Sequence, residues 1–336
     1  MEKHRMVKSL TDRHQTATEA DGRLEREERF SEALSGLEEQ LADLPSFTEV
    51  DRYLLSNNDI PPEALAKLDT GKAPRSSYLS SDASKIQVFV LFGLDGVNSS
   101  DSVMLVALDR VHQKIKLISL ARDSYVFVPE FASFSKLAYS YTWGGAAMAV
   151  KNLNYNYYLN VSDYIAVDFD QLAQIIDRIG GVTVNIDEDE ARYLSGYPNV
   201  HVGDCLLDGE TAVSYARIRK SSATDSDRKR TGRQREVILS ILNTLQTMPL
   251  SQYPGFVRDC LGMCATSFEA ETLLTMAAET LGQNYTVEQY FFPEGQVDWW
   301  AGLIKEYFYY VYDLRRASDR IYRIIYEELY ISGYDD

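Results

Sequence analysis

The chain has 336 residues, of which 45% are hydrophobic, and it carries a formal net charge of −16 at pH 7. This length can bury one sizeable hydrophobic core together with a smaller appendage. The acidic composition argues against nucleic-acid binding, and no apolar run approaches the roughly 18 residues that a membrane-spanning helix requires. We therefore expect a globular protein with no transmembrane or signal segment in the chain as given.

Residues 1–70 form a charged segment in which we expect helices. Apolar residues repeat with alternating spacings of four and three before Pro45, at Phe30, Leu34, Leu37, Leu41 and Leu44. Two heptads are short for a coiled coil, so we favour a helix on its own domain or a loosely ordered arm over a partner helix. Two further short helices are expected between residues 47 and 69, the second begun by Pro61 and Pro62.

The main domain is predicted at residues 85–332, after a serine-rich linker at residues 71–84. Three apolar, β-branched runs open this domain, at residues 86–93, 102–109 and 114–120. The turns between them are too short for crossover helices, which predicts antiparallel neighbours. The end of the first strand, the start of the second and the end of the third then share one edge of the sheet. This edge brings Asp95, Asp101 and the pair Arg122 and Asp123 together.

Helical and strand patterns alternate along the rest of the domain. We expect helices at residues 145–153, 171–179, 269–281 and 315–330, and strands at 164–169, 182–186 and 287–292. Alternation of this kind predicts an α/β layered domain.

A basic stretch interrupts this acidic chain between Arg217 and Arg235. It contains six arginines and two lysines against only Asp225 and Asp227. From about Lys229, apolar residues recur at helical spacing, at Val237, Ile238, Ile241, Leu242 and Leu245. A solvated basic face or a nucleic-acid patch is the alternative to a local anion site, and the acidic pI disfavours it.

The phase of this helix directs two polar side chains inward. Extending the apolar stripe backwards by single turns reaches Gln234 and Arg230. Backbone N–H groups and the helix dipole also attract anions at a helix N-terminus. Arg217 and Arg219 would share a face if their segment were extended. We therefore predict an anion pocket, in which Asp227 orients Arg230.

Carboxylates at the shared sheet edge suggest a metal site. Asp95 and Asp101 are too few to enclose calcium but can hold Mg²⁺ that completes its shell with water and phosphate oxygens. A pair of turn aspartates is the alternative, and Arg122 with the arginine cluster favours the metal. Arg122 would neutralise phosphate charge, and Asp123 would orient it or act as a base, whereas a structural salt bridge is the competing interpretation.

Other chemistries find little support in the sequence. The three cysteines, at 205, 260 and 264, match no zinc pattern, and we expect buried thiols rather than a disulfide between Cys260 and Cys264. No phosphate-binding G-x-x-x-x-G-K-[ST] loop, H-E-x-x-H or G-x-S-x-G motif is present. His112 is predicted to be a turn residue.

Five ordered motifs between Leu117 and Gln234 resemble those of the LytR-CpsA-Psr family of cell-wall glycopolymer transferases. They are LISLARDSYVFVP, SKLAYSYTWGG, DRIGGVTVNI, LLDGETAVSYARIR, and the D-x-x-R-x-x-R-Q pattern at residues 227–234. Their joint order makes chance similarity improbable. Lys136 matches the lysine of the family's K-x-N motif, although a lone lysine is more often a surface residue.

The resemblance implies a three-layer α/β/α domain with a mixed central sheet, preceded here by the helical N-terminal segment. It implies a bacterial phosphotransferase that moves a glycosyl phosphate from a polyprenyl-pyrophosphate carrier to peptidoglycan, with an apolar groove for the lipid and Mg²⁺ at the pyrophosphate. The acting side of the membrane would be the extracytoplasmic face. By this resemblance the catalytic residues are Asp101, Arg122 and Asp123, and the metal ligands are Asp95 and Asp101. The pyrophosphate-binding residues are Arg122, Lys136, Arg217, Arg219, Arg230, Arg233 and Gln234.

Two positions depart from the family pattern. The family's R-S-D-T is here Ser99-Ser100-Asp101-Ser102, with Ser99 in place of the arginine, and its G-S-D is Gly93-Leu94-Asp95. A non-catalytic polyprenyl-phosphate binder or a regulator of cell-wall assembly is therefore the alternative to an enzyme. Transcriptional regulation by DNA contact is disfavoured by the acidic pI.

Overall fold

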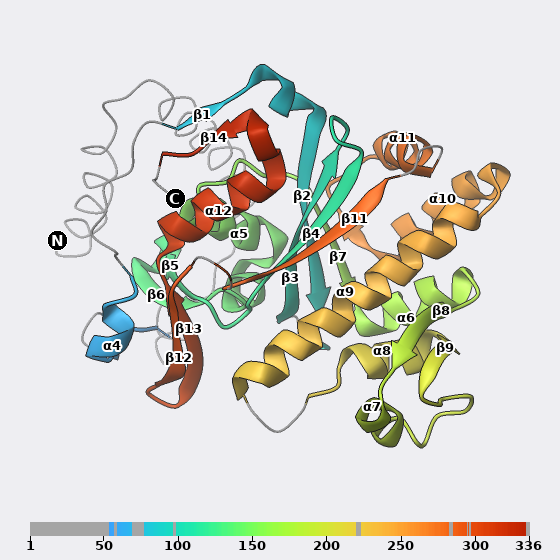
Figure 1. Cartoon of the computed structure of the whole chain (residues 1–336), viewed down its shortest axis with the longest axis horizontal. Helices are drawn as coiled ribbons and strands as arrows, with labels where there is room; N and C mark the ends of the chain where they lie inside the picture. The colour runs from blue at the N-terminus through green and yellow to red at the C-terminus, as the bar shows by residue number, and fades with distance from the viewer. Residues whose placement is uncertain are drawn as a thin grey trace.

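A six-stranded mixed sheet forms the centre of the fold, with the strand order β10-β7-β2-β3-β4-β11 (Figure 1). The computed structural model describes residues 54–56, 59–68, 77–96, 99–219, 223–281, 285–293, 295 and 297–333. The predicted helix between residues 30 and 44 lies outside these ranges. Among the described residues, no helix combines the length and the apolar character needed to cross a membrane.

The three predicted opening strands are confirmed as β2 (Ile86–Leu94), β3 (Ser100–Asp109) and β4 (Lys114–Leu120). Both neighbouring pairs are antiparallel, as their short turns require. On the flanks, β7 (Tyr164–Asp168) runs parallel to β2 and β11 (Thr286–Phe292) runs parallel to β4. The short β10 (Ala265–Thr266) pairs antiparallel with β7.

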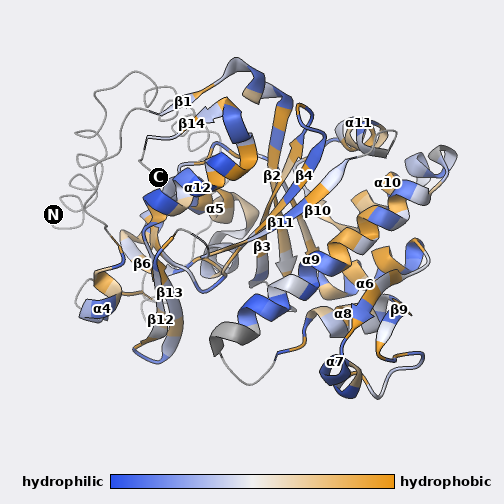
Figure 2. Ribbon diagram, viewed as in Figure 1, coloured by the Kyte–Doolittle hydropathy of each residue, from blue (hydrophilic) through white to orange (hydrophobic). Residues whose placement is uncertain are grey.

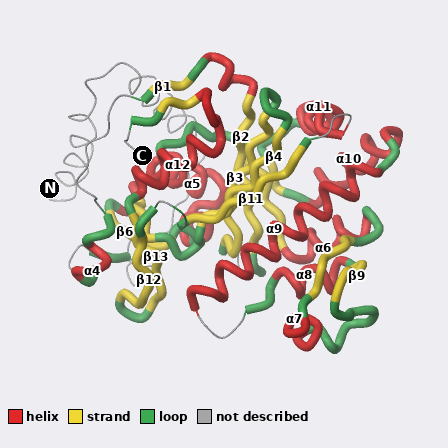
Figure 3. Tube along the Cα trace, viewed as in Figure 1, coloured by secondary structure: helices red, strands yellow, loops and turns green. Residues whose placement is uncertain are grey.

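Alternate residues of the central strands serve two separate cores. On β3, Val103, Leu105 and Ala107 face the core that is covered by α5 (Tyr139–Tyr157) and α12 (Leu314–Tyr326). Met104, Val106 and Leu108 face the core that is covered by α9 (Ala223–Thr247) and α11 (Ala270–Leu281). Figure 3 shows these helices on either side of the strands. The three-layer α/β/α class is thereby confirmed.

A small lobe packs beside α9, next to α10 (Tyr253–Met263). It consists of α6 (Phe169–Arg178), β8 (Val182–Ile186), α7 (Glu188–Tyr193), β9 (Gly203–Leu207) and α8 (Gly209–Ala216). The predicted strand at 182–186 is present, but it pairs with β9 in a hairpin outside the central sheet. The glycine that opens α8 lets that helix approach α6, because a Cβ at Gly209 would collide with the backbone of Ala173.

Two hairpins cover the edge of the sheet at which β4 ends. They are β5 (Tyr125–Val128) with β6 (Ser133–Lys136), and β12 (Trp299–Ile304) with β13 (Tyr307–Tyr312). Short 3₁₀ turns occur at η3 (Ser81–Lys85), η4 (Pro129–Phe131), η5 (Leu250–Gln252) and η6 (Glu327–Leu329).

Part of the predicted N-terminal segment and linker belongs to the domain. Helix α4 (Pro62–Leu65) begins at the predicted Pro61-Pro62 pair, and its Ala64 packs in a core with Tyr309 of β13. Strand β1 (Tyr78–Leu79) pairs with β14 (Tyr330–Ile331), so the second half of the predicted linker is anchored to the domain.

Several helix boundaries differ from the prediction, the largest differences being in α5, α9 and α12. Helix α5 begins at Tyr139 and continues through a break at Gly144 and Gly145, whereas we expected it to begin at Gly145. Helix α9 begins at Ala223, six residues before the predicted start, and α12 ends at Tyr326 rather than at residue 330.

Candidate functional site

Asp101 lies near the start of β3, and three arginines from different elements surround its carboxylate. Arg122, two residues after β4, donates to Oδ1. Oδ2 accepts a hydrogen bond from Arg219 Nη2 at 3.3 Å and lies 3.5 Å from Arg230 Nη1 of α9. The predicted sheet edge therefore brings Asp101 and Arg122 together, and α9 adds Arg230 as its helical phase predicts.

A second branch of contacts runs through Asp123. Its Oδ2 lies 3.6 Å from Arg122 Nε, and its Oδ1 accepts a hydrogen bond of 2.7 Å from Lys136 Nζ of β6. The Lys136 ammonium also lies over the ring of Tyr309, 5.4 Å from the centroid. Burial would lower the pKa of Arg122, but the carboxylates of Asp123 and Asp101 raise it.

Asp227 and Arg230 form the most buried part of the site. Arg230 is 1% exposed, ion-pairs with Asp227 one turn earlier, and leaves its Nε and Nη1 without a hydrogen-bond partner. Burial raises the pKa of Asp227, although the charge of Arg230 opposes this shift. A buried guanidinium with open donors is suited to an additional anion, because an unsatisfied buried N–H group carries a desolvation penalty.

We call these seven residues the ionic cluster: Asp101, Arg122, Asp123, Lys136, Arg219, Asp227 and Arg230. Four cations face three carboxylates within it. Arg219 is half-exposed, and its pKa is lowered by partial burial and by the charges of Arg122 and Arg230. The local surplus of positive charge, within a chain of net charge −16, favours an anionic ligand.

Two predicted arginines lie outside the ionic cluster. Arg217 caps the C-terminus of α8 in a helical conformation, and its guanidinium lies over the ring of Phe169 at 4.5 Å. The segment is not extended at Arg217, so the condition under which Arg217 and Arg219 would share a face is not met. Arg233 is buried, with Nε donating to Glu190 at 2.6 Å and Nη1 donating to the Ile218 carbonyl at 3.1 Å. It holds the segment that carries Arg219 against α9.

Asp95 lies in the turn between β2 and β3. Its carboxylate accepts a hydrogen bond of 2.8 Å from the Ser99 N–H, and its own N–H donates to the Ser99 carbonyl. The two predicted metal ligands, Asp95 and Asp101, therefore flank one hairpin turn. In this structure the Asp101 carboxylate contacts arginines.

An apolar cavity of about 380 Å³ begins at the ionic cluster. Asp101 and Gln234 line it beside the cluster, and the cavity then follows β3 to Leu108, roughly 23 Å at about 3.3 Å per residue. The Gln234 side-chain oxygen is buried without a hydrogen-bond partner. An apolar groove beside the anion pocket was expected, and this cavity has that position.

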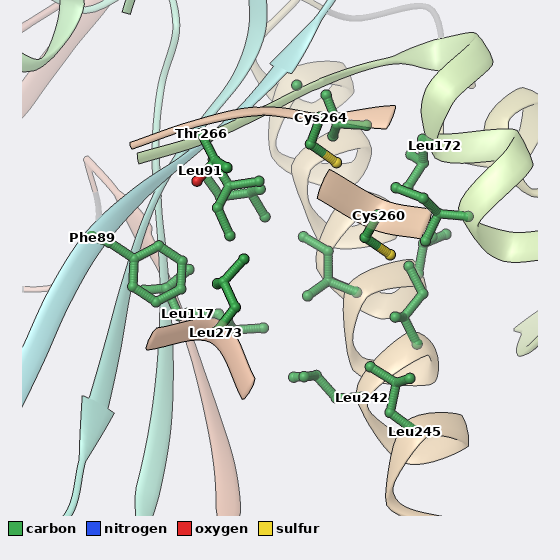
Figure 4. Close-up of a pocket in the computed structure, with 18 of the residues that line it drawn as sticks. Phe89, Leu91, Leu117, Leu172, Leu242, Leu245, Cys260, Cys264, Thr266 and Leu273 are labelled. Atoms are coloured by element: carbon green, nitrogen blue, oxygen red, sulfur yellow. The ribbon is translucent and has the colours of Figure 1, made fainter. Parts of the chain in front are cut away.

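The central sheet and the helices α6, α8, α9, α10 and α11 line the apolar cavity, part of which Figure 4 shows. Its walls include Phe89, Leu91 and Leu117 from the sheet, Leu172 from α6, Leu242 and Leu245 from α9, and Leu273 from α11. The thiols of Cys260 and Cys264 also line it and form no disulfide, and burial raises their pKa to about 12 and about 11. Figure 2 shows the corresponding change along α9, from hydrophilic residues near its N-terminus to hydrophobic residues farther along.

Sequence reasoning missed the aromatic side of the site. Lys136 also lies over Tyr139 and Tyr307, at 5.9 and 5.7 Å from their centroids. The N–H of Tyr310 donates to the Asp123 carbonyl at 3.0 Å. The run YFYYVY at residues 307–312 is rich in aromatic and β-branched residues, a strand signal that could have located this hairpin.

Several known proteins resemble this chain in sequence. The chain is 28% identical over 227 residues to the Oceanobacillus iheyensis polyisoprenyl-teichoic acid–peptidoglycan teichoic acid transferase TagU, covering 65% of this chain and 69% of that relative. It is 29% identical over 184 residues to the Staphylococcus aureus regulatory protein MsrR, covering 52% of this chain and 54% of MsrR.

Among solved structures, TagT bound to LI-WTA matches with a TM-score of 0.61 and 19% identity, over 74% of this chain and 96% of that one. This likeness confirms the fold. A sequence model of the LytR_cpsA_psr family matches residues 64–321, which include the central sheet, the ionic cluster and the apolar cavity. The chain therefore belongs to the LytR_cpsA_psr family.

Proposed function

We propose that this protein transfers a glycopolymer phosphate from a polyprenyl-pyrophosphate carrier to peptidoglycan. One observation carries the proposal: the ionic cluster lies directly at one end of the apolar cavity. A lipid pyrophosphate needs these two environments side by side. The names of the relatives support the same reaction, because TagU is a teichoic acid transferase and TagT has been solved with LI-WTA.

The apolar cavity suits the lipid tail. Its volume of about 380 Å³ is within the roughly 300–1,000 Å³ that is usual for ligand pockets. Each Å² of apolar lipid surface buried there contributes about 25 cal/mol. The neutral thiols of Cys260 and Cys264 add no charge to this environment.

The ionic cluster suits the pyrophosphate. Arg122, Arg219 and Arg230 now surround the Asp101 carboxylate, and phosphate oxygens can replace that carboxylate as the acceptors of their N–H groups. The open donors of Arg230 then gain partners without losing any. Substrate binding would in this way release Asp101.

The transfer step follows from this placement. A peptidoglycan hydroxyl attacks the phosphorus that carries the glycan, the bond to the bridging oxygen breaks, and polyprenyl phosphate leaves with the bonding electrons. Arg122 neutralises charge on the leaving group, and Asp123 with Lys136 holds Arg122 in place. The hydroxyl proton passes to a carboxylate of the ionic cluster. Water in place of the acceptor hydroxyl would give a pyrophosphatase side activity.

Magnesium fits the donor chemistry of the hairpin turn. Carboxylate oxygens such as those of Asp95 and Asp101 are ligands that Mg²⁺ prefers, although Asp101 must first exchange its arginine contacts. When bound, the ion would supply neutralisation of pyrophosphate charge. Because Asp101 is released by the phosphates, we expect substrate and Mg²⁺ to bind cooperatively.

The lipid substrate would bring the protein to a membrane surface, and the peptidoglycan acceptor implies the extracytoplasmic face of a bacterial membrane. The transferred polymer would be wall teichoic acid, capsular polysaccharide or a similar glycan.

A non-catalytic regulator is the second candidate, because the relative MsrR is named as a regulatory protein and Ser99 replaces the family's arginine. The two functions separate in a transfer assay with a lipid-linked donor whose glycan is labelled and a peptidoglycan oligomer. Label that moves to peptidoglycan supports the transferase. Label that stays on the bound lipid contradicts it and favours the regulator.

A further inference from the structure

A second cavity, of about 550 Å³, lies on the aromatic side of the ionic cluster. We call it the aromatic cavity and define it by Arg228 of α9, Tyr290 of β11, Trp299 of β12, Tyr310 of β13 and Arg320 of α12. None of these residues lines the apolar cavity. The two cavities are therefore distinct spaces, formed by different elements.

The aromatic cavity shares supporting backbone with the ionic cluster. Tyr310, in its wall, donates its N–H to the Asp123 carbonyl at 3.0 Å. The carbonyl of Phe292, also in the wall, accepts a hydrogen bond of 2.9 Å from the N–H of Ala121, the residue before Arg122. A ligand in this cavity would thus lie beside the cluster and outside the lipid-binding space.

The lining of the aromatic cavity combines rings with cations. The Trp299 residue is 40% exposed, an unusual position for so large a side chain, and its ring contacts Tyr310 at 5.8 Å with an interplanar angle of 65°. Aromatic rings of this kind pack against the apolar faces of sugars and other amphipathic molecules. Among the described residues, the Arg320 guanidinium has no ion-pair partner.

Two arginines in one cavity of a chain with net charge −16 indicate an anionic ligand. Planar guanidinium groups recognise phosphate and carboxylate oxygens. Rings and guanidinium groups together fit a sugar chain that carries phosphate or carboxylate groups. A purely apolar ligand would leave the Arg320 guanidinium without an anionic partner.

We propose that the aromatic cavity is the subsite that binds an anionic sugar chain next to the pyrophosphate. The inference rests on the proposed function and extends it, because it names the residues that bind the glycan. The same chemistry has two sources: the glycan of the lipid-linked donor, and a peptidoglycan strand with its carboxylates. Separate arms of the experiment distinguish them.

The experiment uses Arg320→Gln and Trp299→Ala in the full chain. Matched controls are Arg315→Gln on the same helix and Leu303→Ala, an exposed residue on the same strand as Trp299. Affinity is measured for polyprenyl pyrophosphate without sugar and for the same lipid with an anionic glycan. The KM for a soluble peptidoglycan oligomer is measured in the transfer assay.

We expect Arg320→Gln to lower the affinity for the glycan-bearing lipid or to raise the KM for the oligomer about tenfold, as is usual for the loss of a charge-assisted contact. Trp299→Ala should change the same quantity in the same direction, because it removes the exposed ring from the cavity. The affinity for sugar-free polyprenyl pyrophosphate should stay within about twofold of the parent, and both controls should resemble the parent. A loss for the glycan-bearing lipid identifies the donor chain as the ligand, and a raised KM for the oligomer identifies the acceptor.

Two results would overturn the inference while leaving the proposed function intact. In the first, the parent protein transfers glycan, but the cavity variants change neither the affinity for the glycan-bearing lipid nor the KM for the oligomer. In the second, the cavity variants lose equal affinity for the sugar-free and the glycan-bearing lipid, which would assign these residues a structural role. A parent protein that binds neither lipid would contradict the proposed function itself, and the inference with it.

Discussion

Asp101 organises the site at the scale of single residues. Its carboxylate is the common acceptor of Arg122 and Arg219 and lies within ion-pair distance of Arg230. One carboxylate thus holds together arginines from three elements, whose mutual repulsion would otherwise separate them. The cluster is pre-assembled for a ligand with several anionic oxygens, which reduces the ordering that binding requires.

The half-exposed Arg219 should bind the pyrophosphate directly. Arg219→Ala should weaken polyprenyl-pyrophosphate binding by at least tenfold, since a charge-assisted hydrogen bond contributes on the order of 1.5–3 kcal/mol. Arg219→Lys should recover only part of the loss, because an ammonium lacks the bidentate fork. Calorimetric titration checks both, with the exposed Arg192→Ala as control. Unchanged affinity in both Arg219 variants would assign that residue a structural role.

Ser99 occupies the position of an arginine in the family pattern. It lies in the turn that carries Asp95, to which it donates its backbone N–H. The loss of one donor to transition-state charge typically costs about 10² to 10³ in rate, so we expect slow turnover in the parent protein. Ser99→Arg should raise the rate of lipid phosphate release, with Ser99→Gln as an uncharged control. Equal rates for all three proteins would show that this turn does not reach the phosphates.

Helix α9 is the element that joins the two halves of the site. Its first turns carry Asp227 and Arg230, and its later turns carry Leu242 and Leu245 in the wall of the apolar cavity. The helical period of its apolar residues was enough to predict that Arg230 and Gln234 point inward. A single rigid element therefore sets the distance between the headgroup site and the tail site.

Other elements could not be predicted as fully. The opening strands and the convergence of Asp101 with Arg122 follow from short turns, which allow only antiparallel neighbours. The position of Arg217 did not follow, because the end of α8 depends on packing against α6 rather than on a local pattern. The contact of Arg233 with Glu190 joins α9 to α7, and sequence spacing does not encode a tertiary contact of this kind.

A bulkier side chain in α10 should obstruct the apolar cavity. Cys260→Phe should weaken binding of a long-chain polyprenyl phosphate about tenfold, which corresponds to roughly 55 Å² of lost apolar contact at 25 cal/mol per Å². Cys260→Ala removes the thiol without adding bulk and should bind normally. Inorganic pyrophosphate should bind all three proteins alike. Equal lipid binding by the phenylalanine variant would mean that the tail lies elsewhere.

The whole molecule has a second charged group of residues at the opposite end of the central strands. There His112, in the predicted turn between β3 and β4, contacts Asp109 Oδ2 at 2.6 Å and Glu328 Oε1 at 2.9 Å. Asp109 also binds the fully buried Lys116 at 2.8 Å, and Lys116 lies 2.8 Å from Glu327. These contacts tie the end of the chain to the sheet.

This arrangement predicts a pH dependence of folding stability. Burial lowers the pKa of His112, but its hydrogen bonds to Asp109 and Glu328 outweigh this effect and raise the pKa above 6.5. The folded protein then holds the proton more tightly than the unfolded chain, so this stabilisation is complete below pH 6.5 and is lost as pH rises through the folded pKa. The free energy of unfolding, measured with urea across this pH range, should show the loss. His112→Gln should remove this part of its pH dependence. The same pH dependence in the variant as in the parent would exclude His112 as its source.

The whole chain is acidic, yet its ionic cluster carries more positive than negative groups beside an apolar cavity. The most direct test of the proposed transfer is the release of polyprenyl phosphate from a polyprenyl-pyrophosphate glycan by the purified protein. It is measured with a peptidoglycan oligomer present, with Mg²⁺ or with EDTA, for the parent and for Asp101→Asn. We predict slow release in Mg²⁺, a matching gain of glycan on peptidoglycan, and neither with EDTA or in the variant. Donor that binds the parent protein in Mg²⁺ but yields no polyprenyl phosphate would contradict the transferase.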